Sequence, residues 1–355
     1  MTLDLAVLIL RAIASAKAIM TSSILLSRKV ISEFGPRIDD ILRAHADRCQ
    51  VLPFDAETRV SDLQLDAIVA AYYSRDIWEG TVKSQLSKSA EAFWGIVDRA
   101  PNLAWLSVFS SGTDHQQYQP HLQRRVRVTT GAGAQAEPVA TAAVTGLLAL
   151  ARRLPHWWRA QQRSQWAPLR GKDVPPDLRG QTAVIVGTGY IGSNIARLLQ
   201  AFGMQTIGVR KRVQPTEHFD AVHGLAQIDA LLPACDWLVL ACPLTPETRG
   251  LMDAKRLALL HPGAGLVNVA RGEVVDETAL AEALSSGRLG HAYLDVFTAE
   301  PLQPESPLWT LPNVLISPHN AGASTGTYGR GVEIFLRNLD NYVAGRALEN
   351  EASGV

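Results

Sequence analysis

The sequence predicts an α/β protein with two domains, each built on a doubly wound parallel sheet. Short apolar runs alternate with amphipathic stretches along the chain, which is typical of a parallel sheet flanked by helices. Near the middle, a glycine-rich turn joins an apolar run to a helical pattern. A length of 355 residues favours two domains, and a content of 47% hydrophobic and 19% charged residues is ordinary for a globular protein.

The first domain is expected to contain several short strands, each an apolar run with polar or turn residues around it. These strands are predicted at residues 23–26, 50–53, 67–71, 104–108 and 126–129. Helices are expected between them, for example at 39–46 and 87–97. An Ala- and Leu-rich segment at 138–154 is long enough for a buried helix that leads into the second domain.

A segment rich in tryptophan follows this helix, at residues 155–176. Trp157, Trp158 and Trp166 lie among Arg and Gln residues, and this segment is too aromatic for a simple linker. Because aromatic and Arg side chains are enriched at interfaces, it indicates a subunit contact and hence a homodimer. The alternative is a surface arm folded onto its own subunit.

The stretch at 182–210 has the pattern of a dinucleotide-binding site. An apolar run at 182–186 predicts a buried strand, and the motif Gly187-x-Gly189-x-x-Gly192 opens a helical pattern directly after it. Such glycines permit a tight turn, a close backbone approach to a pyrophosphate, and packing of the helix on the strand. The helix start, with Tyr190 and Ile191, offers free amides to negative charge. The alternative is a glycine-rich turn without a ligand.

The end of the next predicted strand, at 205–209, indicates which dinucleotide binds. NAD sites place a carboxylate about twenty residues after the glycines, where it holds the ribose 2′-hydroxyl. This chain has Arg210, Lys211 and Arg212 there, and a guanidinium suits the 2′-phosphate of NADP. We therefore expect NADP(H) to be preferred and NAD(H) to be usable. The alternative is a solvated basic turn.

Further strands are predicted in the second domain, at residues 237–241, 265–269, 292–296 and 314–317. Each ends in a loop of polar or special residues. In doubly wound sheets ligands lie beyond the carboxyl ends of the strands, so these loops should converge on the cofactor. The cofactor contacts expected from the loops are Cys242, Pro243, Thr248, Ala270, Arg271, His319 and Gly322.

Three of these loops supply residue types that the chemistry of a 2-oxo acid needs. Arg271 offers two parallel donors that clamp a carboxylate and polarise the adjacent keto oxygen. His319 is suited to exchange a proton, and Glu300 is suited to hold the imidazolium by a hydrogen bond and opposite charge. Taken singly, each has a structural alternative: a helix cap or surface ion pair, a solvated carboxylate, and a structural histidine. Their shared position just past predicted strand ends favours catalysis.

Composition excludes several other classes of protein. A formal net charge of zero leaves no basic footprint for nucleic acid. Cys49, Cys235 and Cys242 are too few and too scattered for a disulfide framework or a metal site, which fits a reducing cytoplasm. The apolar start faintly resembles a signal peptide, but Asp4 stands where a positive charge belongs and the run is too short to span a membrane. Residues 1–20 are interpreted as an N-terminal extension.

The chain resembles the D-isomer-specific 2-hydroxyacid dehydrogenases, which include glyoxylate and hydroxypyruvate reductases. The resemblance extends from about residue 101 to residue 342. It is strongest in VIVGTGYIGSNIARLLQAFGM, in the block from PLTPETRG to ALSSGRL, and in LDVFTAEPL through SPHNAG. It implies a flavodoxin-like substrate domain at 21–130 and 323–355, and a Rossmann dinucleotide-binding domain at 131–322. It also implies that the C-terminal helix, about 326–342, returns to the first domain.

By the same resemblance, three loop residues look like the family's catalytic trio, namely Arg271, Glu300 and His319. Asp295 looks like the residue that anchors the nicotinamide carboxamide. The loop at 110–114 is similar to the family's substrate loop, in which backbone amides, here those of Ser111 and Gly112, bind the carboxylate. The implied reaction is hydride transfer between NADP(H) and a small 2-oxo or D-2-hydroxy acid, with glyoxylate or hydroxypyruvate as the preferred substrates.

Some departures from the family pattern bear on the alternatives. Thr141 stands where many members have Glu, and Arg210 stands where NAD-using members have an acid. Formate dehydrogenases lack the acid that Glu300 supplies, and phosphonate dehydrogenases place a lysine near the substrate loop where this chain has Ser110 and Ser111. A dinucleotide-sensing binding protein of the corepressor type and a flavin protein are the alternatives of other classes.

The pocket that selects the substrate is less well defined by the sequence. Residues after the third predicted strand are candidates, as is an exposed aromatic residue near the C-terminal loops. The candidates are Tyr72, Tyr73, Ser74, Arg75 and Trp309, with a tryptophan of the arm as a further one.

Overall fold

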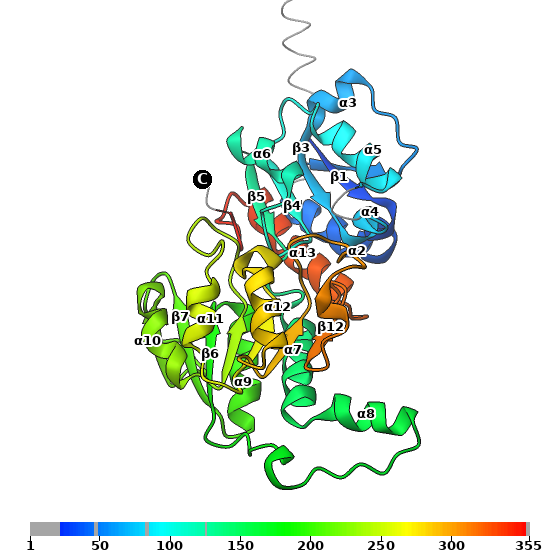
Figure 1. Ribbon diagram of the computed structural model, residues 1–355. Coiled ribbons are helices and arrows are strands. Elements are labelled where there is room, and N and C mark those ends of the chain that lie inside the picture. Colours follow the sequence, from blue (N-terminus) through cyan, green and yellow to red (C-terminus); the bar gives the residue numbers. More distant parts are fainter. Residues whose placement is uncertain (1–21, 46–48, 82–84, 125, 353–355) are drawn as a thin grey trace, which may run out of the picture. The chain divides into compact units, whose positions relative to one another are not determined.

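The computed structural model describes residues 22–45, 49–81, 85–124 and 126–352, and they divide into two compact units. Unit 1 comprises the described chain up to Ala134 together with the part from Tyr328 onward, and unit 2 comprises Gln135–Thr327 (Figure 1). The predicted N-terminal extension, residues 1–20, lies outside the described residues. Each unit has its own parallel sheet, so the predicted α/β class is confirmed.

Unit 1 is built on a sheet whose described strands follow the order β2-β1-β3-β4-β5, all parallel. This is the flavodoxin-like order, with its switch point between β1 and β3. The strands are β1 (Ser22–Ser27), β2 (Cys49–Phe54), β3 (Ile68–Tyr73), β4 (Trp105–Val108) and β5 (Arg127–Thr130). The helices are α2 (Arg28–Ala44), α3 (Asp62–Ala67), α4 (Arg75–Trp78), α5 (Lys88–Val97), η1 (Gln116–Tyr118), α6 (Gln119–Gln123) and α13 (Thr327–Val343).

The first helix begins earlier than the sequence pattern predicts. It starts at Arg28 rather than at residue 39, directly after β1. Ser27 caps it, because its hydroxyl accepts a hydrogen bond from the Val30 amide (3.1 Å). Gly35 and Pro36 lie inside the helix, and these two residues disfavour helix strongly enough to shift the predicted start beyond them.

Unit 2 is built on a second parallel sheet, with its described strands in the order β12-β11-β10-β9-β6-β7-β8. This is the doubly wound Rossmann order, with its switch point between β6 and β9. The strands are β6 (Thr182–Val186), β7 (Gln205–Arg210), β8 (Ala221–Gly224), β9 (Trp237–Leu240), β10 (Gly265–Asn268), β11 (His291–Leu294) and β12 (Val314–Ile316).

The helices of unit 2 cover this sheet and connect its strands. The α-helices are α7 (Ala136–Ala151), α8 (Leu154–Gln162), α9 (Tyr190–Ala201), α10 (Ile228–Leu231), α11 (Ala254–Leu259) and α12 (Glu277–Ser285). The 3₁₀ turns are η2 (Gly171–Asp173), η3 (Leu225–Gln227), η4 (Leu232–Ala234), η5 (Gly272–Val274) and η6 (Pro307–Trp309). No helix in the described part of the chain has both the length and the apolar character that a membrane span requires.

The central strands of unit 2 are buried on both faces. Along β6, Val184 and Val186 pack into one apolar cluster, while Ala183 and Ile185 pack into the cluster on the other face. This is the pattern of a parallel strand with helices on both sides, and it explains the continuous apolar run in the sequence. The core therefore holds the carboxyl ends of these strands in fixed positions.

Two features of unit 2 differ from the predictions. The helix predicted at 138–154 is interrupted: α7 ends at Ala151, and Arg153 adopts a left-handed conformation (φ 58°) before α8 begins. The strand β8 was not predicted, because its four residues are only half-buried and carry no apolar run. It pairs with β7 at the edge of the sheet.

The three cysteines are buried and free, and their burial predicts low reactivity. Burial raises the pKa of Cys235 to about 12 and that of Cys242 to about 11, and it also raises the pKa of Cys49. Because the thiolate is the nucleophile, iodoacetamide should alkylate the folded protein about a hundredfold more slowly at pH 8 than it alkylates free cysteine. Mass spectrometry would measure the labelling, with the denatured protein as the fully reactive control. Fast labelling of Cys242 in the folded protein would contradict this.

Candidate functional site

The glycine-rich turn after β6 has a separate physical reason for each of its glycines. Gly187 has φ 100°, and a Cβ there would lie 2.6 Å from the Ala241 carbonyl oxygen. A Cβ at Gly192 would overlap the carbonyl oxygen of Gly187, so α9 packs on the turn only because residue 192 has no side chain. At Gly189, apart from its chain neighbours, no atom of the described residues lies within 4 Å of where a Cβ would stand.

The surroundings of Gly189 fit a diphosphate. Among the described residues, no side chain caps the start of α9, and Gly189 occupies the N-cap position. Helix starts of this kind offer backbone amides and a favourable dipole to an anion. The neighbouring Thr188 is 7% exposed, and its hydroxyl has no hydrogen-bond partner in the described part of the chain. Open backbone, an uncapped helix and an unpartnered hydroxyl are what the phosphates of a dinucleotide would satisfy.

The basic residues after β7 differ in their surroundings. Arg210 is the last residue of β7 and is half-buried, and one of its guanidinium nitrogens donates to the Thr216 hydroxyl (3.2 Å). Lys211 pairs with Glu247 (2.6 Å), and this hydrogen bond lowers the pKa of Glu247 to about 2. Arg212 is exposed. Arg210 is therefore the residue of the three that the strand itself positions.

Arg271 follows β10, and its backbone is held by Asn268. The Asn268 side chain accepts from the Ala270 amide (3.0 Å) and donates to the Arg271 carbonyl oxygen (3.1 Å). The Arg271 guanidinium donates to the Ala270 carbonyl oxygen (2.8 Å). The next residue is Gly272, where a Cβ would overlap the backbone of Phe297. The loop of Arg271 therefore lies directly against the loop that leads to Glu300.

His319 and Glu300 form a pair in the structure. The Nδ1 atom of His319 lies 2.8 Å from Oε2 of Glu300, and the side chains are 45% and 14% exposed respectively. The other carboxylate oxygen of Glu300 accepts from the Phe297 amide (3.0 Å), which fixes its orientation. Because Glu300 holds Nδ1, the Nε2 atom of His319 is directed away from the carboxylate. A proton at Nε2 can be donated to an oxygen atom placed before it.

Asp295, directly after β11, is 4% exposed. One of its carboxylate oxygens accepts from the Ser317 hydroxyl (2.5 Å) and from the amides of Asn320 (2.9 Å) and Ala321 (3.0 Å). The sequence pattern did not single out Ser317 as a functional residue, and its only signal was its place in the loop after β12. Unit 2 thus brings together at one sheet edge the ends of β10, β11 and β12 with Arg271, Asp295 and His319.

The remaining predicted loop residues of unit 2 lie in the loops that follow its strands. Thr248 donates to the Pro243 carbonyl oxygen (2.7 Å) and so closes the loop after β9. Cys242 and Ala270 are buried in the apolar cluster at this edge. A Cβ at Gly322 would lie 2.5 Å from the side chain of Gln135, so this turn packs tightly before α7.

The predicted substrate loop lies in unit 1, after β4. The Ser110 hydroxyl donates to the Gly112 carbonyl oxygen (3.0 Å), and it lies 3.1 Å from the Tyr118 hydroxyl. The Ser110 carbonyl oxygen accepts from the Gly131 amide (2.9 Å). Ser111, the residue between Ser110 and Gly112, is exposed. The loop is therefore held in a defined conformation by its own unit.

Two candidates for the substrate pocket, Tyr72 and Tyr73, are corrected by the structure. Both lie within β3 and are at most 2% exposed. Tyr72 stacks on Phe335 (4.3 Å between ring centroids), and Tyr73 packs against Phe93 (5.2 Å). Since both rings fill the core of unit 1, neither is available to a ligand. The strand continues two residues beyond its predicted end, which places them inside the sheet.

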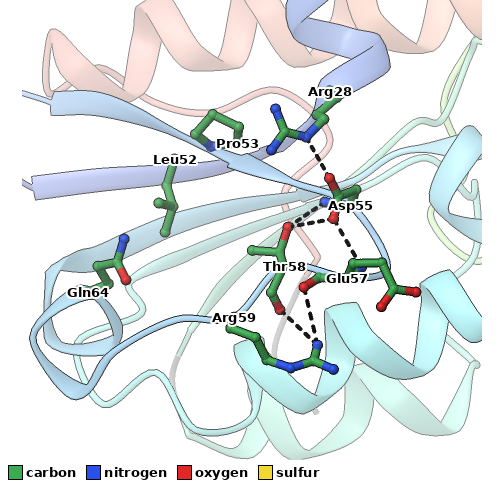
Figure 2. Close-up of a pocket in the computed structure, with 8 residues that line it drawn as sticks. All are labelled: Arg28, Leu52, Pro53, Asp55, Glu57, Thr58, Arg59 and Gln64. Atoms are coloured by element: carbon green, nitrogen blue, oxygen red, sulfur yellow. Dashed lines mark hydrogen bonds and ion pairs between the residues drawn. The ribbon is translucent and has the colours of Figure 1, made fainter.

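A polar groove of about 410 Å³ lies after β2 in unit 1 and is shown in Figure 2. Its charged groups are engaged with the chain itself. Arg28 pairs with Asp55 (2.6 Å), and Arg59 donates to the carbonyl oxygens of Glu57 and Thr58. Because its guanidinium groups already have partners, this groove is a weaker candidate for an anionic ligand than the edge of unit 2.

Comparison with known proteins agrees with this arrangement. Residues 144–321 match the family model described as D-isomer specific 2-hydroxyacid dehydrogenase, NAD binding domain. The chain belongs to the D-isomer specific 2-hydroxyacid dehydrogenase family. The prediction of an NAD(P)-dependent oxidoreductase of this family is thereby confirmed.

Relatives in the family include proteins named as glyoxylate reductases. One from Thermococcus onnurineus is 32% identical over 326 residues, which cover 90% of this chain and 92% of the relative. Another, from Aeropyrum pernix, is 32% identical over 308 residues, which cover 80% and 90%. A solved structure of an NADPH-dependent glyoxylate/hydroxypyruvate reductase from Sinorhizobium meliloti, in complex with NADP and sulfate, has a TM-score of 0.73 at 26% identity and covers 94% of this chain and 98% of that chain.

The open space at Gly189 yields a prediction that separates binding from folding. Gly189→Ala should lose about 1 kcal/mol of stability or less, because the added methyl group meets no atom of the described chain except its neighbours and the cost is that of a poorer N-cap. It should weaken NADPH binding by about tenfold or more, because the methyl group occupies the space of the close backbone approach. Thermal denaturation and fluorescence titration with NADPH would measure the two effects.

Gly95→Ala is the matched control for this variant, since Gly95 also has open space around it but lies in α5 of unit 1. It should leave NADPH affinity unchanged and raise stability by about 0.5–1 kcal/mol, because Ala favours helix over Gly. Unaltered NADPH affinity in Gly189→Ala would show that the dinucleotide does not approach this glycine.

Proposed function

We propose that this protein is an NADP(H)-dependent reductase of small 2-oxo acids, with glyoxylate or hydroxypyruvate as substrate. The observation that carries the proposal is the His319–Glu300 pair, at 2.8 Å, which lies among the same strand-end loops as Arg271 and Asp295. A paired acid and a guanidinium are what reduction of a 2-oxo acid requires. Relatives named as glyoxylate reductases support the choice of substrate.

The residues of unit 2 divide the work of this reaction. Arg271 binds the carboxylate of the oxo acid and polarises the keto oxygen through its two parallel donors. His319 donates its Nε2 proton to that oxygen, while Glu300 holds the ring in place and balances its charge. When the dinucleotide is bound, it supplies the hydride for the keto carbon.

We place the dinucleotide on the strand-end loops of unit 2, with Asp295 as the anchor of its carboxamide. The family model for an NAD-binding domain covers this region. NADP(H) is the preferred form, because Arg210 at the end of β7 stands where a 2′-phosphate would be bound. The proposed contacts are Gly187, Gly189, Tyr190, Ile191, Gly192, Arg210, Lys211, Arg212, Cys242, Pro243, Thr248, Ala270, Arg271, Asp295, His319 and Gly322.

We propose a substrate domain at residues 21–130 and 323–355, most of which is unit 1, and a dinucleotide-binding domain at residues 131–322, most of which is unit 2. The amides of Ser111 and Gly112 are the substrate domain's proposed contacts with the substrate carboxylate. Free, buried cysteines are consistent with a protein of the reducing cytoplasm. The intact set of Arg271, Glu300 and His319 favours an enzyme over a non-catalytic dinucleotide-sensing protein.

Steady-state kinetics would test the proposal directly. Glyoxylate, hydroxypyruvate, pyruvate and bulkier 2-oxo acids should be compared with NADPH and with NADH. We expect the highest kcat/KM for glyoxylate or hydroxypyruvate with NADPH. An absence of turnover with every oxo acid, in a protein that binds NADPH, would instead identify a binding protein. A yellow protein with a flavin spectrum would contradict dinucleotide use.

The first prediction from this proposal concerns the cofactor. Arg210→Gln should raise KM for NADPH by about tenfold, because a charge-assisted hydrogen bond is worth roughly 1.5–3 kcal/mol, and should leave KM for NADH nearly unchanged. Lys255→Gln, an exposed lysine on α11, is the control and should change neither value. Equal losses with both cofactors in Arg210→Gln would mean that Arg210 does not read the 2′-phosphate.

The second prediction concerns Glu300. Glu300→Gln keeps the side-chain shape but replaces the carboxylate that holds Nδ1 of His319 with a neutral amide. The ring is then held less firmly and its charge is no longer balanced when it donates a proton, so kcat/KM for reduction should fall by about tenfold or more while Kd for NADPH stays nearly unchanged. Steady-state kinetics at saturating NADPH and a fluorescence titration with NADPH would measure the two values.

Glu277→Gln is the matched control for Glu300→Gln, because Glu277 also accepts a backbone amide of this loop, that of Thr298 (3.1 Å). Its kcat/KM should equal that of the unmodified enzyme. An unchanged kcat/KM in Glu300→Gln would show that Glu300 does not support the proton donor.

The third prediction concerns assembly, for which we propose a homodimer formed through the tryptophan-rich arm at residues 155–176. Figure 1 shows α8 and the segment after it lying apart from the sheet of unit 2. Trp158 and Trp166 are 62% and 96% exposed, which is unusual for aromatic residues without a partner. Replacing both with Ser should convert the dimer to monomer in sedimentation velocity, whereas Phe202→Ser, an exposed aromatic outside the arm, should not. A monomeric unmodified protein would refute this assembly.

A further inference from the structure

A chain of hydrogen bonds links the core of unit 2 to the loop that carries His319. The hydroxyl groups of Tyr293 and Ser317 lie 2.8 Å apart, and Ser317 donates to the Asp295 carboxylate (2.5 Å). The Ser317 hydroxyl has a single proton, and a carboxylate only accepts. Tyr293 must therefore donate to Ser317, which gives the chain one direction, from Tyr293 through Ser317 to Asp295.

Asp295 in turn holds the backbone on both sides of His319. Its carboxylate accepts from the amides of Asn320 and Ala321, and its carbonyl oxygen accepts from the His319 amide (2.7 Å). His319 itself has φ 50°, in the left-handed region that a residue with a side chain rarely adopts. Such a conformation persists only where surrounding contacts impose it, and residue 295 supplies these contacts.

The start of this chain is fixed by packing. Tyr293 is 7% exposed and lies within β11, in the apolar cluster that joins the sheet to α7. A Cβ at Gly146, on α7, would overlap the Tyr293 ring, so the ring lies against the helix backbone. Because the ring has no room to move toward the helix, its hydroxyl stays in reach of Ser317.

We propose that Tyr293 and Ser317 are positioning residues for the reaction: they orient Asp295 and, through it, hold the loop that presents His319. Neither residue needs to touch substrate or cofactor. The inference rests on the proposed role of His319 as proton donor, since a proton donor displaced by about an ångström loses much of its effect. The competing account is a polar network that stabilises the fold and leaves the chemistry unchanged.

The test compares Tyr293→Phe, Ser317→Ala and Ser317→Thr in the full-length protein, with the preferred oxo acid and NADPH. Tyr293→Phe keeps the ring packing and removes only the donor, so it should fold. We expect kcat to fall about tenfold in Tyr293→Phe and in Ser317→Ala, with KM for the oxo acid and Kd for NADPH changed less than about threefold. The solvent deuterium isotope effect on kcat should rise, because proton donation becomes more limiting. Ser317→Thr should restore most of the activity.

The double variant Tyr293→Phe, Ser317→Ala sharpens the test. If the two residues act through one chain, it should be no slower than Ser317→Ala alone. Multiplied losses would overturn the chain. An unchanged kcat and isotope effect in Tyr293→Phe, or a lower melting temperature without any change in them, would likewise overturn the inference in favour of a purely structural network.

His319→Asn separates this failure from failure of the proposed function. If His319→Asn keeps normal turnover, the proposed proton donor is wrong and both proposals fall. If His319→Asn is inactive but Tyr293→Phe behaves like the unmodified enzyme, the proposed function stands and only the positioning role is refuted.

Discussion

The parallel register of the unit 2 sheet is the constraint on which the candidate site depends. All of its described strands run in one direction, so their carboxyl ends share one edge. The register pairs Leu294 with Ile316, which sets Asp295 beside Ser317. Residues separated in the sequence by tens of positions therefore meet at this edge. The core on both faces of the sheet holds the first residues of the loops.

Close backbone contacts complete what the register begins. Gly192 allows α9 to reach the turn after β6, and Gly272 allows the loop of Arg271 to lie against Phe297. The amide of Phe297 in turn orients Glu300, which faces His319. Backbone contacts, rather than flexible side chains, therefore fix the loop of Arg271 relative to the Glu300–His319 pair. Larger residues at 192 or 272 would force these loops apart, because backbone atoms cannot move aside as a side-chain end can.

Most of the fold and the identity of the loop residues could be predicted from the sequence. Apolar runs and glycine spacing report burial and turns directly, which is why the central strands and the loops after them were located. The edge strand β8 was not predicted, because its half-buried residues do not form an apolar run. The start of α2 was predicted too late in the chain. The low helix propensity of Gly35 and Pro36 predicts a break there, but the helix continues through both residues in the structure.

Hydrogen-bond partners are harder to predict than burial, and this explains which parts of the site were missed. In the sequence, Tyr72 and Tyr73 cannot be distinguished from tyrosines that line a pocket. In the structure, both side chains are buried in the core of unit 1. Conversely, Ser317 looks like an ordinary loop serine until the register of β11 and β12 sets it beside Asp295. A hydroxyl gains a role only from the positions of its neighbours, and these follow from the register of the two strands.

The connection from α7 to His319 shows how a core position can bear on the chemistry at the sheet edge. The Tyr293 ring fills the space between α7 and the sheet, and it fits there because Gly146 has no side chain. An interior packed at this density transmits a shift of the ring rather than absorbing it. The Tyr293 hydroxyl would move with the ring, and the loop of His319 would lose a support although nothing near the acid had changed. Substitutions at residue 146 should therefore weaken the support of the loop that carries His319, as substitutions at Ser317 should.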